Sequence, residues 1–268
     1  MSSMALSQIS IYPVKSARGL DLEQARLVHR GLEYDRRWML VDEKGRFLTQ
    51  RQLSRMALIR PTLERDSLTL RAEGFTPLEL PATLDDGPLR TVQVWEDQCV
   101  AVSAGADADK WLGNVLGQKI RLVYMPDECE RQVDETYARP GDITSFSDGF
   151  PLLLISEASL QDLNARLELP VPMRRFRPNL VISGCKPYAE DDWQRIRIGD
   201  IEFEVVKPCS RCIIPTIDTE TGLRNPDQEP LRTLATYRRR DNKVYFGQNL
   251  IHRGTGLLKI GDPLEIIA

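Results

Sequence analysis

The sequence has few histidines and lacks the motifs that mark several common cofactor sites. Only His29 and His252 are present, far apart in the chain. A single C-x-x-C sequence occurs without a second one or an H-x-x-x-H pair, so the usual four ligands of a structural zinc site are missing. G-x-G-x-x-G and G-x-x-x-x-G-K-[ST] are absent too, so the common nucleotide-binding loops are not indicated.

Long apolar runs are also absent. No segment approaches the ~18 consecutive apolar residues of a membrane-spanning helix, and the N-terminus lacks the apolar stretch of a secretory signal. The five cysteines, an odd number in a chain of 268 residues, fit a reducing compartment better than a disulfide framework. We therefore expect a soluble, cytoplasmic protein that has no membrane partner.

The charge balance gives no sign of a nucleic-acid partner. The formal net charge is -3, and hydrophobic residues (41%) and charged residues (28%) occur in ordinary globular proportions. The 36 lysines and arginines can still form a local anion site. The length suggests one large domain or two modest ones.

Short β-like segments dominate the first hundred residues. They are expected at residues 9–14, 38–41, 68–70, 92–95 and 100–102. A helix is predicted over 107–116, with Gly117 as its C-terminal stop, and a new strand over 120–124. The change of pattern places a domain boundary there, giving domains 1–118 and 119–268. Trp95 and Trp111 are expected to be core residues.

The second half continues the β-rich pattern around two further helices. One helix begins after the N-cap Ser156 and the other at Pro230, while residues 126–149 form an ordered loop over the surface or a site. Strands are expected at 180–182, 196–198, 201–206, 213–217, 244–246, 257–260 and 264–267. The predicted fold class is mainly β (α+β), a barrel with helices packed outside.

The sharpest local feature is the C-x-x-C pair of Cys209 and Cys212. Lys207 and Arg211 lie beside it in sequence, and neighbouring cations favour the thiolate form that binds metals. Taken alone, the pair fits a metal ligand or two structural cysteines. A thioredoxin-like dithiol is disfavoured, because the segment that follows reads as extended rather than helical.

Two basic segments could bind an anion. Residues 173–179 (MRRFRPN) contain three arginines between two prolines, which exclude a helix interior. Residues 12–16 (YPVKS) and 35–38 (DRRW) add a lysine, a serine and two arginines. Each segment alone also fits a solvated loop.

Together these blocks resemble the MOSC family, in the branch that has an N-terminal MOSC-associated β-barrel-like domain and includes amidoxime-reducing components and bacterial reductases of N-hydroxylated compounds. The ordered blocks are YPVKS, DRRW, ISEASLQDLN, RFRPN, PCSRCIIPTID with a following TG, and IGDP, spread over residues 12–263. The order of the set, rather than any single block, carries the resemblance.

The resemblance implies a molybdenum cofactor (Mo–molybdopterin) and assigns roles by position. Cys212 would be the metal ligand and, with Asp148 near the metal, a catalytic residue. Cofactor-binding roles fall to Lys15, Ser16, Arg36, Arg177, Asn179, Cys212 and Asn249. Cys209, Cys99, Cys129 and Cys185 are expected to be structural or to line the core. A soft thiolate suits a soft metal centre.

The implied activity is reduction of N-hydroxylated small molecules, such as N-hydroxylated nucleobases, hydroxylamines and amidoximes, in detoxification. The chain has no ferredoxin-like cysteine set, so electrons would come from a separate ferredoxin-like or flavin partner. An alternative is a sulfur carrier or cofactor-handling protein with a persulfide on Cys212. A third is a cofactor-storage protein without turnover.

Overall fold

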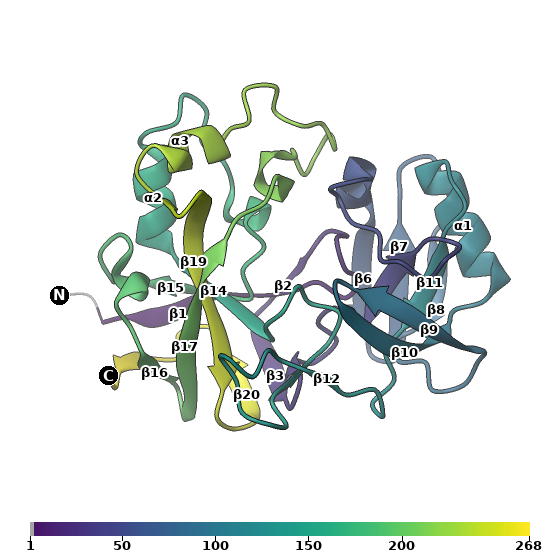
Figure 1. Ribbon diagram of the computed structural model, residues 1–268, viewed down its shortest axis with the longest axis horizontal. Helices are drawn as coiled ribbons and strands as arrows, with labels where there is room; N and C mark the ends of the chain where they lie inside the picture. The colour runs from purple at the N-terminus through teal and green to yellow at the C-terminus, as the bar shows by residue number, and fades with distance from the viewer. Residues whose placement is uncertain (1–2) are drawn as a thin grey trace.

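The computed structural model describes residues 3–268 and contains two β-rich bodies side by side (Figure 1). The larger body is built on a nine-stranded sheet with the order β2-β1-β15-β14-β19-β17-β16-β21, and β18 pairs with β19 off this path. Its strands are β1 (Ala5–Ile11), β2 (Leu20–Leu22), β14 (Leu152–Ser156), β15 (Leu180–Ser183), β16 (Arg195–Ile198), β17 (Ile201–Ser210), β18 (Arg239–Arg240), β19 (Lys243–His252) and β21 (Leu264–Ile266).

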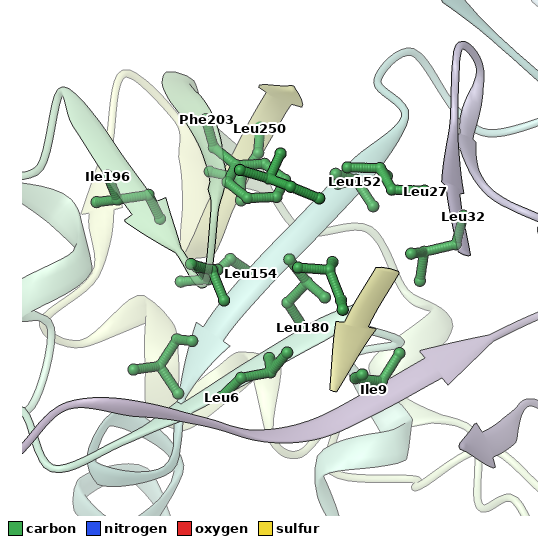
Figure 2. Close-up of a cluster of buried hydrophobic side chains, with 14 of the residues drawn as sticks. Leu6, Ile9, Leu27, Leu32, Leu152, Leu154, Leu180, Ile196, Phe203 and Leu250 are labelled. Carbon is green, nitrogen blue, oxygen red and sulfur yellow. The ribbon is translucent and has the colours of Figure 1, made fainter. Parts of the chain in front are cut away.

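The core of the larger body lies between this sheet and a three-stranded sheet, β20-β3-β4. The second sheet contains β3 (Gln24–Val28), β4 (Gly31–Leu32) and β20 (Gly256–Lys259). Figure 2 shows leucines from strands far apart in sequence, among them Leu6, Leu154 and Leu250, pointing into one cluster. All three side chains are fully buried, and their burial from water is the main driving force that joins these strands.

The smaller body combines a four-stranded sheet, β5-β11-β10-β9, with a three-stranded sheet, β6-β7-β8. These strands are β5 (Trp38–Val41), β6 (Arg60–Glu64), β7 (Ser67–Arg71), β8 (Leu78–Pro81), β9 (Leu89–Val94), β10 (Asp97–Ser103) and β11 (Arg121–Tyr124). Helix α1 (Ala106–Leu116) packs against β11 and ends at Gly117, which has a left-handed φ of 75°.

Two more helices lie on the larger body. Helix α2 (Glu157–Asn164) begins after Ser156, whose side chain accepts a hydrogen bond from the backbone N–H of Ser159, and α3 (Leu231–Ala235) begins after Pro230. The 3₁₀ turns are η1 (Ser54–Leu58), η2 (Met173–Arg175), η3 (Ala189–Asp191) and η4 (Ile214–Thr216). No helix in the described part of the chain is long and apolar enough to cross a membrane. A short hairpin of β12 (Arg131–Gln132) and β13 (Ile143–Thr144) completes the fold.

The mainly β class predicted from the sequence is confirmed. The division into domains 1–118 and 119–268 stays a prediction. Strand pairing in the structure crosses residue 118 in both directions. The N-terminal strand β1 pairs with β15 of the larger body, whereas β11, which lies beyond residue 118, pairs with β5 and β10 of the smaller one. In Figure 1 the purple β1 accordingly lies among the green strands of the larger body.

Two local predictions are wrong. Residues 213–217 were expected to be a strand, but Ile214–Thr216 form the 3₁₀ turn η4, because Pro215 lacks a backbone N–H to pair with a neighbouring strand. Trp95 was expected in a core strand, but β9 ends at Val94 and Trp95 lies in a turn with 42% of its surface exposed. Trp111 is partly buried against the core of the smaller body, as predicted.

Candidate active site

A single pocket brings together every residue that the sequence singled out as a site residue. Its walls come from the segment after β1, the loop before β14, the segment before β15, the end of β17 and the middle of β19. The predicted residues that line it are Lys15, Ser16, Arg36, Asp148, Arg177, Asn179, Cys212 and Asn249. The structure thus places these residues together, and their roles toward a cofactor stay predictions.

Lys15 is a buried cation at the bottom of this pocket. Its backbone N–H donates to the carbonyl of Trp38, which fixes the segment after β1 against β5. Its ammonium donates to the carbonyl of Phe146 (2.7 Å) and to Oδ1 of Asp148 (2.6 Å). Burial lowers the pKa of Lys15 from 10.5 to about 8, although the neighbouring Asp148 carboxylate opposes this change. The site therefore holds a positive charge at a cost in desolvation.

Asp148 lies at the rim, with 58% of its side chain exposed. One carboxylate oxygen accepts from Lys15, and the other is 3.2 Å from a guanidinium nitrogen of Arg51. Desolvation alone would raise the pKa of Asp148, but the two cations lower it well below its usual range. The side chain is therefore an anion at any physiological pH.

Arg36 is held by an acid and an amide. Its Nη1 donates to Oδ2 of Asp35 (2.5 Å) and to Oδ1 of Asn179 (3.1 Å). The fully buried side chain of Asn179 also accepts from the backbone N–H of Leu153 and donates to the carbonyl of Ser10. Asn179 therefore ties β1 and β14 together and orients Arg36 toward the pocket.

Arg177 has an unpaired donor in the same region. Its backbone is left-handed (φ 58°), and its guanidinium lies 4.1 Å from the ring centroid of Tyr12. Nη1 donates to the carbonyl of Ala17 (2.6 Å), whereas the buried Nη2 has no hydrogen-bond partner. Burial lowers the pKa of Arg177 to about 10. A buried donor without a partner is costly, and a bound acceptor would satisfy it.

The two cysteines of the C-x-x-C pair lie at one wall of the pocket, half-buried and free. Nη1 of Arg211 is 3.2 Å from Sγ of Cys209, so the cation expected beside the pair is next to the first thiol. On the side of Cys212 the pocket is instead lined by the cation of Arg51. Lys207 lies away from the thiols, with its ammonium 4.2 Å from the ring centroid of Tyr137.

Asn249 lies on β19, where its side chain donates to the carbonyl of Lys207 (3.1 Å). This bond joins β19 to β17 next to the irregularity in their pairing that precedes Cys209. The amide therefore supports the strand that leads to the cysteines.

Sequence reasoning missed Arg51, Phe150 and Phe176, which also line the pocket. Arg51 follows a polar turn after β5 and belongs to no motif that would single it out. Only the fold shows that it reaches Asp148 and lines the same pocket as Cys212.

The electrostatics of the pocket favour an anion. Its charged lining consists of five basic side chains and one acidic one: Lys15, Arg36, Arg51, Arg177, Arg211 and Asp148. The described residues contain no group of three or more His, Cys, Asp or Glu side chains that could hold a metal ion by themselves.

Comparison with known proteins gives two family matches. Residues 3–119 match the MOSC N-terminal beta barrel domain, and residues 142–265 match the MOSC domain. The chain is 39% identical over 280 residues to mitochondrial amidoxime-reducing component 1 of Mus musculus, covering 98% of this chain and 82% of that protein. It is 38% identical, with the same coverage, to the protein of that name from Homo sapiens. A molybdenum cofactor sulfurase of Oryza sativa is 34% identical over 92% of this chain, which spans 32% of that protein.

Proposed function

The chain belongs to the MOSC family with an N-terminal MOSC beta barrel domain, and from this premise we propose that it is a molybdenum-cofactor-dependent reductase of N-hydroxylated compounds. The single observation that carries the proposal is the pocket that joins the Cys212 thiol to five basic side chains. The names of the mouse and human relatives, amidoxime-reducing component, support the reaction class.

The residues of the pocket fit this cofactor. Molybdopterin carries a phosphate, and Lys15, Arg36 and Arg177 are the buried or half-buried cations available to it. The unpaired Nη2 of Arg177 needs an acceptor that the protein does not provide. Cys212 offers the soft sulfur ligand, and a dithiolene would add the others, in keeping with the lack of a protein metal cluster among residues 3–268.

The chemistry needs an oxygen acceptor, two electrons and two protons. The molybdenum centre supplies the oxygen-accepting redox chemistry when bound. In the net reaction the N–O bond of an N-hydroxy compound breaks. Two electrons and two protons are consumed, and the products are the amine or amidine and one water. Electrons would come from a separate ferredoxin-like or flavin protein. We place the reaction in the cytoplasm and regard detoxification of N-hydroxylated bases as its use.

The positions of the side chains support the following roles. Lys15, Arg36 and Arg177 bind the anionic end of the cofactor. Cys212 would bind the metal at the wall of the pocket, which Arg51 also lines. Asp148 stays ionised and accepts hydrogen bonds from both Lys15 and Arg51.

Metal content after expression in a cofactor-producing host tests the proposal. Wild-type protein should retain molybdenum close to one atom per chain, and Cys212→Ala should lose the metal or its reductase activity. Cys209→Ala is the matched control, since its thiol lies three residues earlier, at the end of β17 next to Arg211, and it should keep both. Wild-type protein without molybdenum or pterin under these conditions would refute the reductase.

One observation favours a second function. The similarity to a molybdenum cofactor sulfurase covers 92% of this chain, so Cys212 could carry a persulfide for sulfur transfer. A mass increase of one sulfur atom on Cys212, without retained metal, would favour the carrier. Retained metal without reduction of any N-hydroxylated compound would favour cofactor storage.

A further inference from the structure

The tip of the β9–β10 hairpin carries a tryptophan at a position that favours glycine. Val94 pairs with Asp97, so Trp95 and Glu96 alone form the turn. Trp95 has a φ of 57°, and Glu96 is not among the residues with positive φ. A two-residue hairpin turn with a positive φ only at its first position favours glycine there. A bulky side chain at such a φ is strained, so the local backbone does not explain the indole.

The indole lies in an outward extension of the candidate active site. This outer groove shares Asp148, Phe150 and Cys212 with the pocket and adds Trp95. The guanidinium of Arg51, which reaches Asp148, lies 4.8 Å from the ring centroid of Trp95. The indole keeps 42% of its surface exposed. Trp95 is thus fixed by Arg51 and still open to a ligand.

Other aromatic rings line the same groove or support its lining. Phe150, in the loop before β14, packs against Tyr137 with ring centroids 5.9 Å apart. Behind Trp95, Phe47 packs at 5.0 Å. The entrance to Cys212 is therefore lined by the exposed ring of Trp95 and the half-buried ring of Phe150, on segments of both β-rich bodies. Flat apolar surface of this kind binds planar rings by stacking and by removing apolar area from water.

We propose that Trp95 determines substrate specificity by binding the planar ring of aromatic N-hydroxylated substrates in the outer groove, with the N–OH group toward Cys212. The inference rests on the proposed reductase function. It adds that planar aromatic and heteroaromatic compounds are preferred over small aliphatic ones, because only the former can cover the indole.

The test compares benzamidoxime with acetamidoxime, which share the reacting group and differ in the ring. In Trp95→Gly the turn gains the residue that its backbone favours and loses the indole, so the fold should be retained, as thermal unfolding will show. We expect the ratio of kcat/KM for benzamidoxime to that for acetamidoxime to fall about tenfold in Trp95→Gly, the size of one aromatic stacking contact. The loss should lie mainly in KM. Trp95→Phe should restore most of the ratio.

Trp111→Phe is the matched control, because Trp111 lies in α1, outside both pockets, and should leave the ratio unchanged. A ratio that stays the same in Trp95→Gly would overturn the inference. Calorimetric titration of benzamidoxime without a reductant separates it from the proposed function. If wild-type protein reduces neither compound, the reductase fails. Binding about tenfold weaker in Trp95→Gly would still support the role of Trp95, and equal binding would overturn it.

Discussion

Replacing Lys15 with methionine tests whether the pocket holds its charge at the expense of stability. The side chain is 5% exposed, and burial lowers its pKa from 10.5 to about 8. At ~1.36 kcal/mol per pKa unit, keeping the ammonium charged in the cofactor-free protein costs on the order of 3 kcal/mol. Methionine has a similar length and no charge, so the substitution removes this cost.

A second effect partly offsets the stability that is gained by removing the buried charge. The carbonyl of Phe146 loses its 2.7 Å donor, and a buried acceptor left unpaired costs ~1–3 kcal/mol. Asp148 keeps Arg51 and is largely exposed, so it adds little. At pH 7 we therefore expect Lys15→Met to be as stable as the wild type or up to ~2 kcal/mol more stable.

The pH dependence gives the sharper result. The folded state has the lower pKa, so between pH 8 and 10.5 it binds fewer protons than the unfolded state. Stability then rises with pH over this range, and the penalty, fully present below pH 8, disappears. From pH 7 to 10 the wild type should gain ~2.5 kcal/mol relative to Lys15→Met.

Urea unfolding of the cofactor-free proteins across this pH range measures the difference. Lys119→Met, at a side chain that is 83% exposed, controls for the loss of one lysine. Parallel stability curves for wild type and Lys15→Met, or a variant more than ~2 kcal/mol less stable at pH 7, would refute the reasoning. Molybdenum content should move the other way and fall in Lys15→Met, because the cation is lost from the anion site.

Three further substitutions test other parts of the site. Asn179→Ala should lower the free energy of unfolding by ~2–3 kcal/mol, since the buried N–H of Leu153 loses its acceptor; urea unfolding within ~0.5 kcal/mol of wild type would contradict this. Gly247→Ala should cost ~2 kcal/mol or more in a thermal melt, because φ is 84° and the added Cβ would lie 2.6 Å from Cγ1 of Ile155; an unchanged melting temperature would show that the backbone is not constrained there. Asp148→Asn should change unfolding stability by less than ~1 kcal/mol, because the Asp148 carboxylate is 58% exposed and solvent screens it; a larger loss in the same urea assay would mean that its pair with the buried Lys15 is shielded.

Elements with strong local signals could be predicted from the sequence. Helix α1 ends at Gly117, where the left-handed φ that glycine tolerates stops the helix. Ser156 caps α2 through its own hydroxyl. Strand β3 was not predicted, because its alternation of polar and apolar residues, with Ala25 and Leu27 buried, spans only five positions. Its pairing with β20, more than two hundred residues later, depends on tertiary contacts.

The same distinction between local signals and tertiary contacts applies to the residues of the candidate site. Residues within motifs, such as Lys15 and Cys212, could be singled out because their motifs occur along the chain in the order typical of the MOSC family. Arg51 and Trp95 could not, because neither lies in a motif and their approach to Cys212 results from the placement of separate loops. Trp95 was misassigned to the core because an aromatic residue after an apolar strand usually continues it.

The pocket itself argues for a bound anion. Lys15 is buried with a lowered pKa, and Arg177 has a buried Nη2 without a partner. Each of these destabilises the cofactor-free fold, and each is relieved by an anionic acceptor in the pocket. Lys15 follows the first strand, whereas Arg177 precedes β15, so neither segment forms the site alone. An anion that bridges them would also hold the two segments together, and ligand binding should therefore stabilise the whole chain rather than one loop.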